Sequence, residues 1–359
     1  MRRKRAAAAC NGRKKDSYNQ SVMLSPEKQQ DEQCDSTGDF VEHFELTEHV
    51  RIAIIALYGF IFALLGILFF VKKVFHKHVD NLWIRTKSFL GIVLFFSVVF
   101  LCNKITAFLG LALISYLCLK EFFSLIPTRR TDRIAILWAY LSIPITYYIL
   151  YTHWMLLFYL FIPLYMFMLL AARMVISGNT EGFLKNLAVL QFGLMITVYA
   201  VGYLGLIAQI PLAYNPKGGS LGLLFYILVF TIANDFMQMF CGKAFGKHKI
   251  IPKVSPNKTW EGFLGGVVGS TFLSMGMGYY LTPLSLPELA WVGAGLAITG
   301  FFGDVTMSAI KRDMGVKDTS TLIPGHGGIL DRLDSLLFTA PLFFHYLAYT
   351  FKIMIRPGM

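Results

Sequence analysis

The sequence predicts an all-α, polytopic helical membrane protein with about ten transmembrane helices, counted as nine to ten. Of its 359 residues, 55% are hydrophobic and only 15% are charged, a balance that excludes an ordinary soluble domain. Apolar runs of about 20 residues recur along the chain, and this length crosses a hydrocarbon core of about 30 Å. The alternating segments of about 10 residues that build a membrane β-barrel are absent, so the runs are predicted to be helices.

Ten apolar runs follow one another along the chain, and each is predicted to form one membrane-crossing helix. Their approximate limits are 52–71, 88–103, 106–124, 134–151, 154–175, 187–212, 221–242, 262–281, 288–307 and 335–355. Because some neighbouring runs nearly touch, the number of spans is left at nine or ten.

The polarity of the chain divides it into three parts. Residues 1–47 form a polar tail of mixed charge, for which we expect disorder because it offers too little apolar surface for a core. Residues 48–220 hold the N-terminal predicted helices. Residues 221–359 hold the remaining helices and two polar loops, 243–261 and 308–334. The third part therefore carries the residues that could perform chemistry.

Lysine and arginine give the chain a formal net charge of +12 and gather in short loops. These basic loops lie at 72–87, 129–133, 243–258 and 311–332. With the predicted spans, all of them fall on one side of the membrane, which the positive-inside rule makes cytoplasmic. The N-terminal tail would then face outward despite its basic start. Orientation thus explains the charge, and no nucleic-acid partner is predicted.

The segment Ser308–Asp334 holds a dense set of charges between two apolar runs. Four lysine and arginine residues lie among four aspartates around the turn Pro324-Gly325-His326-Gly327-Gly328. Cations bind phosphates and carboxylates bind Mg²⁺, so the two signs together indicate polyphosphate and metal chemistry at a membrane surface. For any single charge in the segment, a salt bridge that only anchors the loop is the alternative.

Carboxylates inside or beside membrane helices are costly and are therefore functional candidates. The four candidates are Asp235, Asp304, Asp331 and Asp334. Asp235 lies inside the seventh predicted span, where a structural pair with a lysine is the alternative. On a continuing helix, Asp304, Ser308 and Lys311 share one face.

Oxygen ligands of this kind suit Mg²⁺, which proteins usually hold through one or two carboxylates and substrate phosphates. A second cation, including a monovalent one, is left open. His326 has no cysteine or second histidine nearby, so zinc is not predicted. The glycines Gly327 and Gly328 would let backbone N–H groups approach an anion.

The other polar loop carries Ser255, Lys258 and Thr259, whose hydroxyls and ammonium group suit phosphates. A turn followed by a helix start explains Thr259 and Glu261 equally well. Neither loop has the spacing of a soluble nucleotide-binding motif. Cations, carboxylates and hydroxyls without a protein nucleophile favour phosphoryl-type transfer. The position at the membrane predicts one lipid substrate and one soluble polyphosphate.

Taken together, these residues resemble the phosphatidate cytidylyltransferase (CDP-diacylglycerol synthase) family. Its signature runs from S-x-[aliphatic]-K-R through K-D to H-G-G-x-x-D-R-x-D. The matching positions are Ser308, Lys311, Arg312, Lys317, Asp318, Ser320, His326, Gly327, Gly328, Asp331, Arg332 and Asp334. The segment SPNKTWEG at 255–262 is similar to the family's S-P-x-K-T-x-E-G, and the convincing match covers about 235–335.

One departure from the family's pattern lies in the seventh predicted span. The family commonly shows D-x-x-A-Y-x-x-G there, and this chain keeps Asp235 and Gly242 at that spacing. Gln238 and Met239 replace the Ala-Tyr pair. The difference favours a divergent paralogue whose lipid acceptor is less certain than its chemistry.

The resemblance implies that phosphatidate attacks the α-phosphorus of CTP, giving CDP-diacylglycerol and pyrophosphate for phospholipid biosynthesis. The implied Mg²⁺ ligands are Asp304 and Asp331, with Asp235 or Asp334 in support. The implied catalytic residues are Lys311, Arg312, Ser308 and His326. The implied substrate-binding residues are Ser255, Lys258, Thr259, Glu261, Lys317, Asp318, Gly327, Gly328 and Arg332. Arg332 could equally hold Asp331 in place.

Two other functions compete with this interpretation. A CTP-dependent polyprenol-type lipid kinase would release CDP instead of pyrophosphate. An ion-coupled transporter would need acidic residues near the bilayer midplane and broken helices in repeated halves, and no repeat is seen. The expected location is a bacterial plasma membrane, with the endoplasmic reticulum as the alternative and the site facing the cytoplasm. The sequence leaves open whether the protein is a homodimer.

Overall fold

A computed structural model describes residues 44, 46–74, 80–126, 133–178, 180–324 and 327–352. The chain divides into two compact units, Met1–Glu42 and His43–Met359, and all of the following concerns the second. The predicted tail lies almost entirely outside the described residues. Apart from two isolated β-bridges, the described residues contain no strand.

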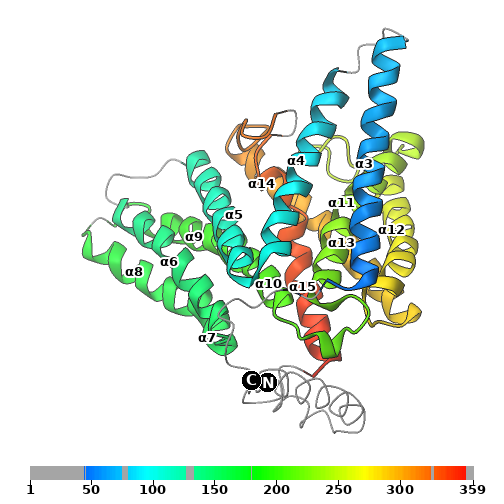
Figure 1. Cartoon of the computed structure of the whole chain (residues 1–359). Helices are drawn as coiled ribbons and strands as arrows, with labels where there is room; N and C mark the ends of the chain where they lie inside the picture. The colour runs from blue at the N-terminus through cyan, green and yellow to red at the C-terminus, as the bar shows by residue number, and fades with distance from the viewer. Residues whose placement is uncertain are drawn as a thin grey trace, which may run out of the picture. The chain divides into compact units, whose positions relative to one another are not determined.

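The second unit is a bundle of helices (Figure 1). In chain order they are α3 (Glu48–Val74), α4 (Asp80–Cys102), α5 (Lys104–Leu125), α6 (Arg133–Tyr151), α7 (Met155–Leu160), η2 (Phe161–Met166), α8 (Phe167–Ile176), α9 (Phe183–Leu194), η3 (Met195–Tyr199), α10 (Ala200–Ala208), η4 (Leu212–Tyr214), α11 (Gly219–Phe245), α12 (Trp260–Leu281), α13 (Leu286–Asp313), α14 (Leu330–Leu333) and α15 (Leu336–Thr350). The π-helical turns η2 and η3 lie inside otherwise continuous spans.

The predicted all-α membrane fold is confirmed. Each of the ten predicted runs coincides with a helix or with a continuous set of helices. By length and composition, eight of the described helical segments can cross a membrane. The predicted number is reached only when α12 and α15 are added, because α15 has 15 residues and α12 holds six glycines that lower its mean hydropathy.

Two helices run further than the predicted spans, into the predicted polar loops. Helix α11 continues to Phe245, and α13 continues to Asp313. Helix α13 ends in a Schellman motif, in which Gly315 takes a φ of 70° and its N–H bonds Arg312 O at 3.1 Å. The N–H of Val316 bonds Lys311 O at 2.9 Å. Lys311 and Arg312 therefore lie in the last turn of a helix.

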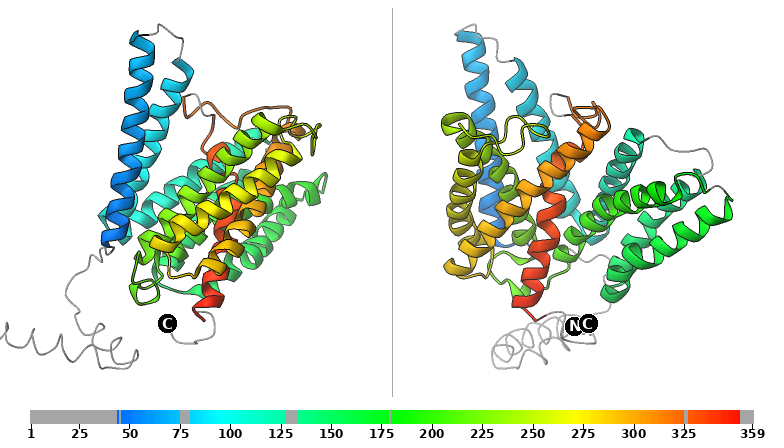
Figure 2. Two further views of the ribbon diagram at one scale, coloured as in Figure 1. Left: turned by 90° about the vertical axis from the view of Figure 1, so that its right-hand side faces the viewer. Right: turned by 180° about the vertical axis from the view of Figure 1, so that it is seen from behind.

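Helices α11, α12 and α13 lie side by side, and glycine permits the close approach of the first two (Figure 2). A Cβ atom at Gly266 would overlap the Gln238 side chain and lie 3.0 Å from the Gln238 Cα. At the opposite end, the Asn215 side chain donates to Leu281 O at 2.9 Å and Gly219 O at 2.8 Å. Small residues and interhelical hydrogen bonds are the usual means of packing helices in membranes.

The centre of the unit is formed by α10, in which every residue from Ala200 to Ala208 is buried. It packs against α5 and α15. Helix α13 in turn packs on α15, where Gly303 faces the backbone of Asp334 and Ser335. The α10–α15 core therefore joins the N-terminal helices to the helices that carry the polar motifs.

We expect Gly266→Ala to lower the free energy of unfolding by about 1–3 kcal/mol, because the added methyl group overpacks the α11–α12 contact. The matched control is Gly276→Ala in the same helix, where no atom lies within 4 Å of the added Cβ. That control should be neutral or slightly stabilising, since alanine favours helix. Thermal unfolding of both variants in detergent measures the difference, and equal midpoints would contradict the packing argument.

Candidate active site

Polar segments distant in sequence meet at one end of the helix bundle (Figures 1 and 2). The Ser88 hydroxyl of α4 donates to Pro324 O at 2.8 Å. The Arg312 side chain donates to Val254 O at 3.3 Å and to Val316 O at 3.2 Å. The loop between α11 and α12 and the loop between α13 and α14 are therefore joined at this end, which also receives α4.

Three of the predicted carboxylates gather here. Asp235 of α11 accepts a hydrogen bond from the Ser335 hydroxyl at 3.0 Å, and Asp334 accepts one from Ser335 N–H at 2.8 Å. Asp304 of α13 accepts from the Ser308 hydroxyl at 3.3 Å, as the predicted shared helical face requires. Burial raises the pKa of the Asp334 carboxyl well above its ordinary value, and the charges of Asp304 and Asp235 raise it further.

Lys258 supplies the cation beside this acidic group. Its ammonium lies 2.6 Å from Asp304 Oδ2, donates to Gln238 Oε1 at 3.1 Å, and sits 5.3 Å from the centre of the Phe301 ring. Gln238 in turn donates to Asn234 Oδ1 at 3.2 Å. The residue that departs from the family pattern thus orients a predicted substrate-binding lysine.

Asp331 is separate from the acidic group and has donors on both oxygens. Lys311 Nζ bonds Oδ1 at 2.7 Å, and both side chains are nearly fully buried. Oδ2 accepts from Thr319 N–H at 2.8 Å and Gly328 N–H at 3.0 Å. Burial acts to raise the pKa of Asp331, but these hydrogen bonds outweigh it and hold the pKa below its ordinary value.

In the α11–α12 loop, two predicted substrate-binding residues serve the local structure. Thr259 is the N-cap of α12 and accepts from Gly262 N–H at 3.2 Å. Glu261 accepts from Lys247 N–H at 2.9 Å and lies 2.6 Å from His248 Nδ1. The turn-and-helix-start alternative therefore accounts for both side chains. Ser255 is joined to this turn through its backbone, which donates to Ile251 O and accepts from Lys258 N–H.

The remaining predicted residues lie on or near the surface of the α13–α14 loop. Lys317, Asp318, Arg312 and Arg332 are exposed. Gly327 has a φ of 86° and closes a tight turn through two backbone hydrogen bonds with Ile323. The predicted catalytic His326 lies outside the described residues.

Within the described part of the chain, no three His, Cys, Asp or Glu side chains are arranged as a complete metal site. Mg²⁺ does not require one, because it takes one or two carboxylates and completes its shell with phosphates and water. Asp235, Asp304 and Asp334 supply hard oxygen donors near enough to act on one another electrostatically, and Asp304 pairs with Lys258. This donor set fits Mg²⁺ better than the saturated Asp331 does.

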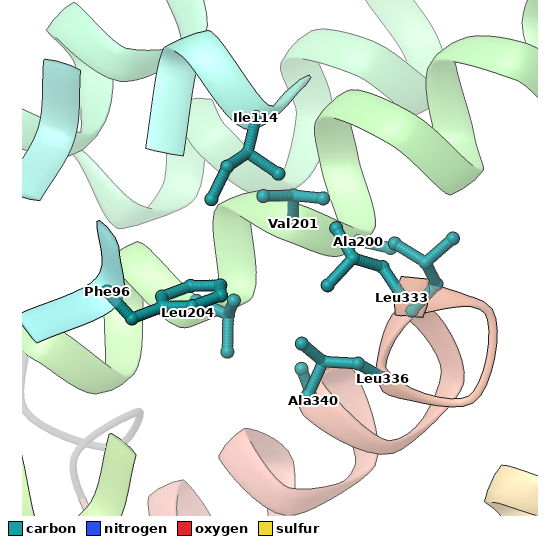
Figure 3. A pocket seen from close by; sticks show the side chains of 9 residues that line it. Phe96, Ile114, Ala200, Val201, Leu204, Leu333, Leu336 and Ala340 are labelled. Atoms are coloured by element: carbon teal, nitrogen blue, oxygen red, sulfur yellow. The ribbon is translucent and has the colours of Figure 1, made fainter. Parts of the chain in front are cut away.

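The interior beside Leu333 and Leu336 contains an apolar cavity. Figure 3 shows a small cavity lined by side chains from α4, α5, α10 and α15, including Phe96, Ile114, Ala200 and Leu336. None of its lining residues is polar.

Glu121 is a candidate that the sequence analysis missed. It lies in α5, is 6% exposed, and accepts hydrogen bonds from the α13–α14 loop. The sequence does contain a signal for it, because Glu121 is an acidic residue inside the apolar run at 106–124. A carboxylate inside a membrane span is energetically costly and is therefore a functional candidate.

Comparison of the sequence with known proteins identifies a matching family and several relatives. The model of the cytidylyltransferase family matches residues 83–350. The uncharacterized protein YnbB of Escherichia coli (strain K12) is 42% identical over 266 residues, covering 74% of this chain and 87% of YnbB. The phosphatidate cytidylyltransferases of Mycobacterium leprae and Haemophilus influenzae are 38% and 42% identical over 149 and 139 residues. Those alignments cover 40% and 37% of this chain and about half of the two enzymes, 46% and 48%.

We expect Lys311→Met to lower the free energy of unfolding by about 3–5 kcal/mol, because it leaves the buried Asp331 carboxylate without its cation. Lys317→Met removes an exposed lysine from the following loop and should change that energy by about 0.5 kcal/mol at most. Denaturant titration in detergent compares the two. Equal stability of both variants would show that the ion pair is dispensable.

Proposed function

Since the chain belongs to the cytidylyltransferase family, we propose that it transfers CMP from CTP to phosphatidate, giving CDP-diacylglycerol and pyrophosphate. The observation that carries the proposal is the meeting of Asp235, Asp304 and Asp334 with Lys258 at one end of the bundle. The proposal requires that a lipid headgroup and a soluble nucleotide both reach this position. Sequence similarity to named phosphatidate cytidylyltransferases supports the same reaction.

The proposed reaction is a substitution at phosphorus. A phosphate oxygen of phosphatidate forms a bond to the α-phosphorus of CTP, and the bond from that phosphorus to the oxygen bridging to the β-phosphate breaks. Pyrophosphate leaves with the electron pair. The phosphate of phosphatidate is already a nucleophile, so no protein base is needed, and catalysis consists of positioning and charge neutralisation.

In this proposal Asp304 would hold Mg²⁺ with Asp235 or Asp334 in support, and substrate phosphates and water would complete its shell. When bound, the ion would neutralise charge on the CTP phosphates and the leaving pyrophosphate. Lys258 moves from Asp304 to a phosphate while Gln238 keeps its ammonium oriented. The Lys311–Asp331 pair holds the α13–α14 loop beside the site, and the Ser308 hydroxyl would donate to a phosphate oxygen.

The remaining predicted residues keep secondary roles in the proposal. Arg312 joins the two loops that would surround the nucleotide. The exposed Lys317 and Arg332 would attract CTP. His326 would donate to a phosphate. We further propose that the site faces the cytoplasm of a bacterial cell, because the basic loops belong on that side and the named relatives are bacterial.

The reaction is tested with purified protein in detergent, phosphatidate, Mg²⁺ and CTP labelled at the α-phosphate. We expect label in the lipid phase together with one pyrophosphate for each lipid labelled, and loss of both after chelation of Mg²⁺. CTP labelled at the γ-phosphate, incubated with a polyprenol as acceptor, serves as the control. Transfer of the γ-label with release of CDP would establish the polyprenol-type kinase reaction instead, and no lipid label from either nucleotide would exclude both.

We expect Asp304→Asn to lower kcat by about 100- to 1000-fold, because it removes a charge that organises the metal and Lys258. The matched control is Asp313→Asn, an exposed carboxylate nine residues further along the same helix, which should keep wild-type turnover. Steady-state assays at saturating CTP and phosphatidate measure both. Equal kcat values for the two variants would remove Asp304 from the site.

A further inference from the structure

A second carboxylate holds the signature loop, and it comes from the N-terminal half of the bundle. Glu121 lies in α5, a candidate membrane span, and is 6% exposed. Among the described residues, no lysine or arginine forms an ion pair with it. A carboxylate in such a position costs several kcal/mol unless hydrogen bonds replace its lost hydration.

Those hydrogen bonds come from both ends of the segment 319–330. Oε1 accepts from the Ser320 hydroxyl at 2.7 Å and from Ile329 N–H at 3.0 Å. Oε2 accepts from Leu330 N–H at 2.9 Å and lies 3.0 Å from the Thr319 hydroxyl. Each oxygen thus faces one hydroxyl and one backbone N–H, one from each end of the loop.

The contacts of Thr319 join Glu121 to the Lys311–Asp331 pair. The Thr319 hydroxyl lies between Glu121 Oε2 at 3.0 Å and Asp331 Oδ2 at 2.9 Å. Its backbone N–H donates to Asp331, and Asp331 binds Lys311. Glu121 also accepts a hydrogen bond from the N–H of Leu330, which is the first residue of α14. Asp331 is the next residue of the same helix.

The space around Glu121 also explains a glycine of the signature. A Cβ atom at Gly328 would overlap Thr319 Oγ1 and Glu121 Oε2. Gly328 additionally donates its N–H to Asp331 at 3.0 Å. The backbone at this position must therefore pass between the two carboxylates, which leaves no room for a side chain.

We propose that Glu121 is a positioning residue: it joins the two ends of the 319–330 loop and thereby sets the Lys311–Asp331 pair for CMP transfer. The inference rests on the proposed function for its kinetic part. It makes α5 a component of the site, although α5 lies about 200 residues before the loop in sequence. Glu121 itself does not touch the substrates in this arrangement.

The test variant is Glu121→Gln, which keeps the side-chain length and removes the charge. Whichever oxygen becomes NH₂, one backbone N–H of Ile329 or Leu330 then faces a donor and loses its acceptor. Because small misplacements of reacting groups are costly, we expect kcat to fall about 10- to 100-fold while the KM for CTP changes little. Lys120→Gln, which removes the exposed neighbouring charge of the same helix, should leave both unchanged.

A milder variant keeps the proposal testable if Glu121→Gln fails to fold. Ser320→Ala removes one of the hydroxyl donors to Glu121 and leaves its two backbone bonds in place, so its kcat should fall less than that of Glu121→Gln. Kinetic constants are expressed per folded molecule, determined by size-exclusion chromatography and thermal unfolding. Wild-type kcat in folded Glu121→Gln, or a loss that disappears on this correction, would overturn the proposal.

Coupling to the ion pair separates positioning from general stabilisation. Lys311→Met should lower kcat by a much smaller factor in the Glu121→Gln background than in the wild type. Both substitutions disturb the same Glu121–Thr319–Asp331–Lys311 contacts, so their effects should not add. Equal losses in the two backgrounds would show that Glu121 acts independently of Lys311, and would overturn the proposal.

Hydrogen exchange distinguishes failure of this inference from failure of the proposed function. We expect Glu121→Gln, and not Lys120→Gln, to speed amide exchange in the peptide covering 327–333 while the peptide covering 247–261 is unchanged. This readout needs no turnover. Inactive wild-type protein with the expected exchange pattern would refute the cytidylyl transfer alone, whereas unchanged exchange at 327–333 would refute the role of Glu121.

Discussion

The need to satisfy each buried carboxylate inside an apolar bundle governs the polar end of this protein. Burial removes hydration from these groups, and an uncompensated buried charge costs several kcal/mol. Asp331 meets this need with Lys311 from α13, Thr319 from the loop and Gly328 from the turn. These donors come from three segments of the chain, so the bonds to this one carboxylate fix the relative positions of the three segments.

The carboxylates at this end consequently fall into two kinds. Asp331 and Glu121 have donors from the protein on both oxygens, and these donors define the course of the 319–330 loop. Asp235, Asp304 and Asp334 instead act on one another, and within the described residues they bond the Ser335 hydroxyl and N–H, Ser308 and Lys258. A bound cation would relieve the mutual repulsion within this second group, which is the physical basis for proposing it as the Mg²⁺ site.

The helices could be predicted from the sequence because the hydropathy of a window of about 20 residues depends only on the residues within it. The helix ends were harder to predict from the sequence, because the end of α13 depends on the left-handed backbone conformation of Gly315. The shared face of Asp304, Ser308 and Lys311 followed from helical periodicity alone. The role of Asp331 could not be read from the signature, because its partners Thr319 and Gly328 bond it mainly through backbone N–H groups that every sequence possesses.

Glu121 escaped the sequence analysis for the same reason, with the added difficulty of distance along the chain. Two of its four partners are backbone N–H groups, and all four lie about 200 residues away. A membrane helix offers one general clue in such cases: an acidic residue within it must have partners, even when no basic residue is within reach in the sequence. Applying that rule to every apolar run, and not only to those beside a motif, would have singled out Glu121.

The departure at Gln238 shows how a family site can be altered without changing its charges. An alanine at this position could neither accept from Lys258 nor donate to Asn234, as the Gln238 amide does. The amide fits because Gly266 on α12 leaves space for it. It extends the polar contacts of Lys258 into the buried part of α11, where Ser270 also donates to Asn234 at 3.0 Å. The change therefore acts on the lysine of the SPNKTWEG segment and leaves the acidic group intact, so under the proposed function it would alter how Lys258 meets a phosphate and not the metal-binding carboxylates.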